Sequence, residues 1–199
     1  MPRITPIYIH IPKTGGTSIL TALGEKRGLH IPVQDAGFQK RLKKLDAAGR
    51  EPFLFTVFRD PIERMISLFH YYNSMDLSRP RTQENVLLAH IAQAYSSCDA
   101  FWSGVDLPSL ANATVMFRDQ RWFFRRAKRS VEVIPFTERL GQAIKERVGV
   151  EIPHLNRTRH GTAKEELAEE TAAKLRGWLA TDVEYWEDLC SQGSQAVHP

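Results

Sequence analysis

The chain has 199 residues, a formal net charge of +4 and a hydrophobic content of 42%. This length suits one domain with its own core, and no run of about 18 apolar residues indicates a membrane span. With Cys98 and Cys190 as the only cysteines, neither a disulfide framework nor a cysteine-based zinc site is expected. Because Met1 lies three residues before the first apolar run, no signal peptide is expected, and we predict a cytoplasmic protein.

The first expected element is a strand over the apolar residues 4–11, followed by a helix over 17–27. The connection between them contains His10-Ile-Pro-Lys-Thr-Gly-Gly-Thr-Ser18. Its two glycines let backbone N–H groups turn toward an anion without a Cβ in the way, and Lys13 adds a full charge. We therefore predict a phosphate-binding loop, with His10 holding it from the strand side. It is not a Walker A loop, whose lysine follows the glycines.

A second strand is expected over residues 53–58, which are apolar except for Thr56. Arg59 lies at its carboxyl end, and Pro61 suits the first turn of a helix over 61–73. Ligands of open α/β sheets bind outside the carboxyl ends of the strands. The sequence therefore predicts two phosphate sites in one crevice.

The remaining pattern alternates strands with helices. Further strands are expected over 29–33 and 131–134, and further helices over 38–48, 83–95, 119–128 and 138–148, with two more near the carboxyl terminus. This alternation predicts an α/β, P-loop-like three-layer fold in which a small central parallel sheet is flanked by helices. We expect a single domain over 1–199, with 73–130 as a helical insert or lid.

Positive charge gathers between Arg118 and Arg129, where six cations stand against Asp119 alone and Trp122, Phe123 and Phe124 interleave with them. One interpretation is an amphipathic helix with a solvated basic face. The other is a surface for an anionic acceptor or a nucleotide. No nucleic-acid motif accompanies the cluster, so we expect no nucleic-acid partner.

Three motifs in this order resemble the sulfotransferases that use 3′-phosphoadenosine-5′-phosphosulfate (PAPS). The loop from His10 to Ser18 is similar to their 5′-phosphosulfate loop, and Phe58-Arg-Asp-Pro-Ile-Glu-Arg-Met-Ile-Ser67 is similar to their 3′-phosphate motif. Glu132–Leu140, followed by Ile152-Pro-His-Leu-Asn156, is similar to a segment of the carbohydrate sulfotransferases. The resemblance covers residues 4–190 and is nearer to the heparan-type branch than to the cytosolic phenol and steroid branch.

The resemblance implies a role for each residue of the loop. The 5′-phosphate and the sulfate would be wrapped by Thr14, Gly15, Gly16, Thr17 and Ser18. Thr17 and Ser18 equally suit simple capping of the following helix. Charge that grows on the departing phosphate oxygen would be stabilised by Lys13, as cations do in phosphoryl transfer.

The 3′-phosphate would be held by Arg59 and Ser67, and Arg157 would cover the nucleotide from the loop after the third motif. A guanidinium suits bidentate phosphate binding, but Arg59 could instead form an ion pair with Asp60 or Glu63. The family resembled transfers the sulfuryl group from PAPS without magnesium, so no metal site is expected.

Transfer to an acceptor also requires a base. Gly28-Leu-His-Ile-Pro32 resembles the segment that supplies it in several carbohydrate sulfotransferases, which implies His30, since an imidazole titrates near neutral pH. A buried structural histidine is the alternative. Glu25 is the second candidate for the base, and His70 is the third.

These observations lead to three functional hypotheses. The first is a sulfotransferase that uses PAPS and a hydroxyl or amine of a carbohydrate or glycolipid-type acceptor. The second is a P-loop-type kinase that uses Mg-ATP, with Asp60 as a magnesium ligand at the end of a hydrophobic strand. The third is a nucleotide-binding module without catalytic activity.

Overall fold

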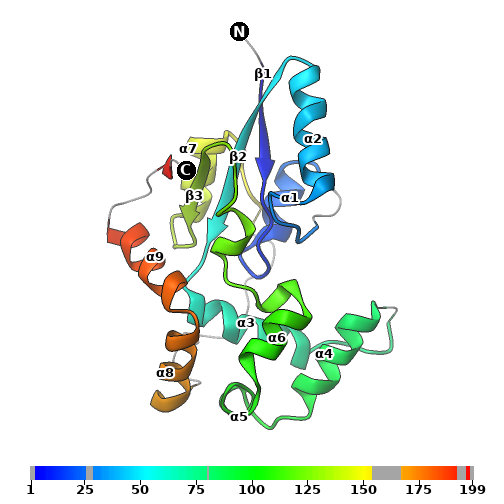
Figure 1. Ribbon diagram of the computed structural model, residues 1–199, viewed down its shortest axis with the longest axis vertical. Helices are drawn as coiled ribbons and strands as arrows, with labels where there is room; N and C mark the ends of the chain where they lie inside the picture. Colours follow the sequence, from blue (N-terminus) through cyan, green and yellow to red (C-terminus); the bar gives the residue numbers. More distant parts are fainter. Residues whose placement is uncertain (1–2, 26–28, 80, 154–166, 192–195, 198–199) are drawn as a thin grey trace. The chain divides into compact units, whose positions relative to one another are not determined.

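The structure is a computed structural model that describes residues 3–25, 29–79, 81–153, 167–191 and 196–197. The chain divides into two compact units, whose elements are labelled in Figure 1. The first comprises Met1–Arg59, Asp119–Arg157 and Glu184–Pro199, and the second comprises Asp60–Arg118 and Thr158–Val183. The predicted loop and Arg59 therefore belong to the first unit, whereas Ser67 belongs to the second.

The first unit is built on a sheet with the strand order β1-β2-β3-β4. Its strands are β1 (Arg3–Tyr8), β2 (Arg50–Phe58), β3 (Val131–Pro135) and the short β4 (Ala196–Val197). The first three are parallel, with Tyr8 opposite Phe55 and Leu54 opposite Val131, whereas β4 is antiparallel to β3. The predicted small parallel sheet is confirmed, and the carboxyl ends of β1 and β2 lead into the predicted binding segments.

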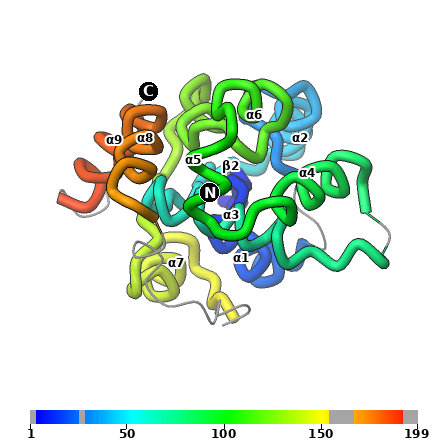
Figure 2. The backbone as a smooth tube through the Cα atoms, turned by 90° about the horizontal axis from the view of Figure 1, so that it is seen from below, coloured from blue at the N-terminus to red at the C-terminus, as the bar shows by residue number. Residues whose placement is uncertain are grey.

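Helices cover both faces of this sheet, which confirms the three-layer α/β fold (Figure 2). On one face, α1 (Gly16–Ala22) and α7 (Leu140–Val148) pack against β2 in a cluster that contains Phe55 and Val57. Side chains alternate along a strand, so Phe58 points to the opposite face. There its ring lies 4.9 Å from that of Tyr185 in α9 (Ala180–Ser191), and α2 (Ala36–Ala47) covers the same side.

Residues 119–128 do not form the predicted α-helix. They contain one turn of 3-10 helix, η2 (Arg121–Phe123), followed by turns. The Asp119 carboxylate accepts the N–H of Trp122 at 2.7 Å, which closes a local turn in place of a continuing helical ladder. Phe123 and Phe124 are buried, as expected of the aromatic residues.

Residues 29–33 do not form the predicted strand either. Pro32 has no N–H to offer a sheet ladder, and the N–H of Val33 instead donates to the carbonyl of Phe123 at 2.8 Å. This segment is therefore attached to the η2 turn rather than to the edge of the sheet.

The second unit is helical in its described residues. It contains α3 (Pro61–Asn73), α4 (Gln83–Gln93), α5 (Cys98–Gly104), α6 (Leu107–Ala113), η1 (Val115–Phe117), α8 (Glu169–Trp178) and the start of α9. The predicted bounds of α3 are confirmed at both ends, and at its start Asp60 caps the first turn and Pro61 follows. Between residues 73 and 110 no described residue lies in a strand, as expected. Across the described residues, no helix combines the length and apolar character that crossing a membrane requires.

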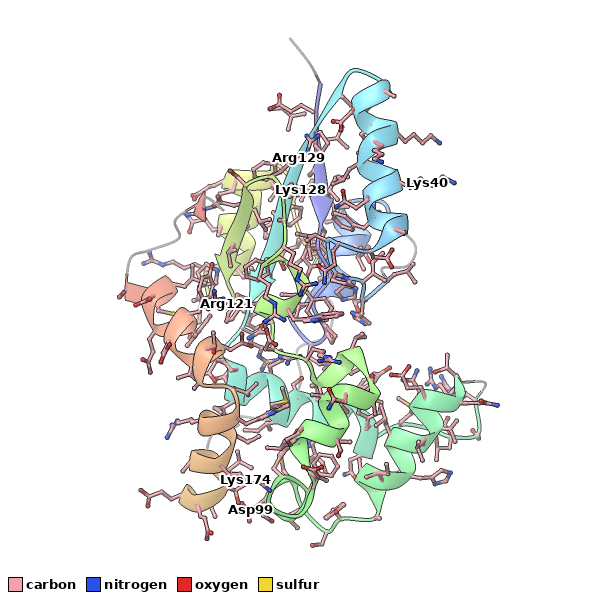
Figure 3. All side chains as sticks on the ribbon, viewed as in Figure 1. Lys40, Asp99, Arg121, Lys128, Arg129 and Lys174 are labelled. Carbon is pink, nitrogen blue, oxygen red and sulfur yellow. The ribbon has the colours of Figure 1, made fainter. Side chains whose placement is uncertain are left out.

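Hydrogen bonds from polar side chains connect the elements of the second unit. Arg64 of the second motif is fully buried and donates to the carbonyls of Met116 at 3.1 Å and Arg118 at 2.5 Å. Lys174 of α8 donates to three carbonyls around the carboxyl end of α5, and Asp99 of α5 accepts the N–H of Ala168 at 2.8 Å (Figure 3). Since a guanidinium must be hydrogen-bonded when buried, Arg64 is assigned to holding the 116–118 segment.

Candidate functional site

The loop between β1 and α1 has a constrained backbone. Lys13 has φ 66°, which makes it the one described non-glycine residue in the left-handed region, and Gly15 has φ 80°. For an ordinary side chain this conformation costs about 1–2 kcal/mol. Such strain is retained where the surrounding structure imposes it, and it is concentrated at functional sites.

Both glycines of the loop lie against aromatic rings. A Cβ on Gly16 would be 1.9 Å from Nε2 of His10, and a Cβ on Gly15 would be 3.1 Å from Cε2 of Phe136. The ring of His10 therefore occupies the space of a side chain at Gly16. This contact agrees with the expectation that His10 holds the loop from the strand side.

Two cations meet at the loop. Nη1 of Arg59 donates to the carbonyl of Lys13 at 3.3 Å, and the guanidinium lies 5.0 Å from the centroid of the Phe136 ring. Burial, followed by the nearby charge of Arg59, lowers the pKa of Lys13 from 10.5 to about 8. Two cations held together in a partly buried site disfavour each other's charge. An anion between them would relieve this cost, so the pair is suited to a negative ligand.

The hydroxyl of Thr14 is used inside the loop. Thr14 is fully buried, and its hydroxyl donates to the carbonyl of Ile11 at 2.9 Å and lies 3.1 Å from the hydroxyl of Tyr8. A ligand would therefore meet Thr14 through its backbone rather than its side chain. Thr17 is exposed and Ser18 is buried at the start of α1. Because α1 has only seven residues, an anion at this loop would be held by the loop N–H groups and the two cations rather than by a helix dipole.

Gln120 holds Arg59 in place and was not predicted from the sequence. Its side-chain oxygen accepts the N–H of Arg59 at 3.0 Å, and its side-chain nitrogen donates to the carbonyl of Arg59 at 2.8 Å. Gln120 is fully buried. Arg59 directly follows β2, and the two hydrogen bonds satisfy its backbone N–H and carbonyl groups. They thereby hold the chain in place at the end of the strand.

Replacing Gln120 by leucine should lower the free energy of unfolding by about 2–4 kcal/mol, because it leaves two buried backbone groups of Arg59 without their partners. Urea denaturation would measure the change. Gln142→Leu is the matched control, since Gln142 lies on α7 and its side-chain nitrogen donates to the side chain of Glu146 in an exposed hydrogen bond. An equal effect of the two substitutions would contradict the assigned role of Gln120.

The predicted base lies beside the loop. Nδ1 of His30 is 3.3 Å from the carbonyl oxygen of His10, and the two imidazole centroids are 4.1 Å apart. A carbonyl can only accept a hydrogen bond, so this contact places the proton of a neutral His30 on Nδ1. Nε2 is then the nitrogen that can take a proton from an acceptor.

The other two candidates for the base differ in their surroundings. Glu25 forms an ion pair with Arg41 of α2, with Oε1 at 2.6 Å from Nη2. This pairing gives Glu25 a structural role at the far end of α1. His70 lies near the end of α3 in the second unit.

Ser67 is half-buried, two turns into α3 in the second unit. Arg157 lies outside the described residues. The structure therefore brings together Lys13, the loop glycines, Arg59 and His30 within the first unit, and the assignments of Ser67 and Arg157 remain predictions.

Two arginines of the basic segment make structural contacts within the first unit. Arg121, Lys128 and Arg129 of this segment are labelled in Figure 3. The guanidinium of Arg121 lies 5.4 Å from the centroid of the Tyr185 ring, and Arg129 forms a 2.7 Å ion pair with Asp46 of α2. Arg125 and Arg126 are exposed. These observations favour the solvated basic face over a ligand surface for most of the segment.

Comparison of the chain with protein-family models, curated proteins and solved structures gave no match. Its function is therefore inferred from its own residues and from the geometry around Lys13.

Proposed function

We propose that this protein is a PAPS-dependent sulfotransferase acting on a hydroxyl or amine of a carbohydrate or glycolipid-type acceptor. The observation that carries the proposal is the pairing of Lys13 with Arg59 at the ends of adjacent parallel strands. The lysine precedes the glycines, and its pKa is lowered to about 8. This arrangement offers one cation to a transferring group and a second to another phosphate of the same nucleotide.

The proposed chemistry is an in-line transfer. The bond between sulfur and the 5′-phosphate oxygen breaks while a bond forms between sulfur and the acceptor atom, which yields 3′,5′-ADP (PAP) and the sulfated acceptor. Lys13 stabilises the charge that develops on the departing phosphate oxygen. His30 takes the acceptor proton on Nε2. Loop N–H groups orient the 5′ end, and Arg59 binds the 3′-phosphate.

The kinase alternative has less support from the described residues. Its magnesium ligand would be Asp60, but Oδ1 of Asp60 accepts the N–H groups of Ile62 at 2.9 Å and Glu63 at 3.1 Å. That oxygen caps α3. The same cation pair would also serve a module that binds nucleotides without catalysis, so activity has to be measured separately from binding.

Thermal stabilisation distinguishes the three functions, because a ligand of the folded state raises the unfolding temperature. Selective stabilisation by PAP would support the sulfotransferase, whereas stabilisation by Mg-ATP alone would support the kinase. A screen of sugar and glycolipid acceptors with labelled PAPS then tests transfer. Binding of PAP with no transfer to any acceptor would favour the non-catalytic module.

Arg59→Ala should weaken PAP binding roughly 10- to 100-fold, because it removes a charge-assisted phosphate contact of about 1.5–3 kcal/mol. Isothermal titration calorimetry would measure the dissociation constants. Arg126→Ala is the matched control, since Arg126 is an exposed arginine of the same unit. Unchanged PAP affinity in Arg59→Ala would show that Arg59 does not bind the nucleotide.

A further inference from the structure

A row of side chains connects the loop to His30. The hydroxyl of Tyr8 lies 3.1 Å from that of Thr14, and the Tyr8 ring stacks on His10 with centroids 5.5 Å apart. His10 in turn meets His30 at a centroid distance of 4.1 Å. The His10 ring also lies against Gly16 and fills the space that a side chain would need there. One imidazole thus touches both the anion loop and the predicted base.

We propose that His10 is a positioning residue that joins the Lys13 loop to His30. Its carbonyl accepts the Nδ1 proton of His30, and its ring packs against the His30 ring at an interplanar angle of 46°. Together these contacts hold His30 with Nε2 as the proton-accepting atom. The role of His30 as a base rests on the proposed function, whereas the pairing of the two histidines does not.

The supports of His10 make this role possible. Thr14 donates its own proton to Ile11, so the contact between the two hydroxyls requires Tyr8 to donate to Thr14. Burial raises the pKa of Tyr8, which keeps its phenol protonated for this bond. Because the His10 ring is in contact with both the Tyr8 ring and Gly16, it has little freedom to turn. A fixed ring presents a fixed surface to His30.

Nitrogen-15 NMR of the full chain tests the proposal, because the two ring nitrogens of histidine have different shifts when protonated and when not. Free neutral histidine favours the Nε2–H tautomer, and the geometry here requires Nδ1–H for His30. We expect the Nδ1–H signature in the wild-type protein, its loss in His10→Ala, and its retention in Tyr8→Phe, which keeps the stacked ring.

Two results would overturn the proposal. An Nε2–H signature for His30 in the wild-type protein would show that the contact with the His10 carbonyl is not made, whatever the variants do. Retention of the Nδ1–H signature in His10→Ala would show that the His10 ring has no positioning role, since that variant keeps the backbone carbonyl.

Turnover provides a readout that depends on the proposed function. With PAPS and a working acceptor, His10→Ala should lower turnover roughly tenfold or more, which is part of the 10²–10⁴-fold contribution of a positioned base. The fall in turnover should exceed the loss of PAP affinity. A wild-type protein that does not bind PAP would refute the proposed function, and the tautomer of His30 would still decide the role of His10.

Discussion

Gly16→Ala is expected to weaken PAP binding roughly 10- to 100-fold. A Cβ at this position would lie 1.9 Å from Nε2 of His10, so either the imidazole or the loop backbone has to move. A displaced loop would lose charge-assisted hydrogen bonds to the phosphate that are worth about 1.5–3 kcal/mol, which corresponds to this loss of affinity. Calorimetric titration of the purified variant with PAP would measure the loss.

Gly177→Ala is the matched control. Gly177 lies within α8, and a Cβ there would meet nothing within 4 Å. This variant should bind PAP normally and gain up to about 1 kcal/mol in its free energy of unfolding, because alanine is the better helix former. If Gly16→Ala bound PAP within a factor of about three of the wild type, the close contact between His10 and the loop would be refuted.

Lys13→Met is expected to stabilise the unliganded protein at pH 7 by up to about 3 kcal/mol, since a shift of one pKa unit corresponds to about 1.4 kcal/mol. The folded state lowers the pKa of Lys13 from 10.5 to about 8. The charged side chain therefore opposes folding at every pH below about 8. Between pH 8 and 10.5 the unfolded chain binds more protons than the folded one, so wild-type stability rises with pH relative to the variant.

Urea denaturation at pH 7 and at pH 9.5 would measure this difference between wild type and Lys13→Met. Lys43→Met, which changes an exposed lysine of α2, should alter the free energy of unfolding by less than about 0.5 kcal/mol at both pH values. A Lys13→Met protein less stable than the wild type at pH 7 would show that burial and Arg59 do not disfavour the charge on Lys13.

The same substitution should have the opposite effect on function. A bound anion favours protonated Lys13, so wild-type affinity for PAP should fall as the pH rises above about 8, by at most tenfold per unit. Lys13→Met should bind PAP more weakly and lack this decline. Its turnover should fall further than its affinity, on the order of 10²–10³-fold, because the charge on the leaving oxygen is largest in the transition state. Equal losses of PAP affinity and of turnover would show that Lys13 binds the phosphate but does not stabilise the transition state further.

Together these predictions separate two properties of the loop. The close fit of Gly16 against His10 determines where an anion would sit, and the Lys13–Arg59 pair determines how strongly charge is stabilised there. Retaining a lysine that opposes folding is expected where function requires the charge.

Local sequence signals were sufficient to predict much of the structure of the first unit. The parallel strands follow from continuous apolar runs, and their carboxyl ends locate the loop and Arg59 without knowledge of any contact. The start of α3 follows from Asp60 and Pro61, which act on the first turn of the helix. In each case the signal and the structure that it specifies lie within a few residues of each other.

The tertiary structure decided the features that depend on distant partners. Gln120 lies 61 positions from Arg59 and forms two hydrogen bonds with its backbone. Val33 and Phe123 are likewise distant in sequence and share a third hydrogen bond. These bonds take the place of the helix predicted over 119–128 and of the strand predicted over 29–33. No local propensity reports such bonds, because their energy is realised only when the chain is folded. The same holds for the lowered pKa of Lys13 and for the ring of His10 against Gly16. Sequence placed a charge and a glycine in the loop, and only packing determined what surrounds them.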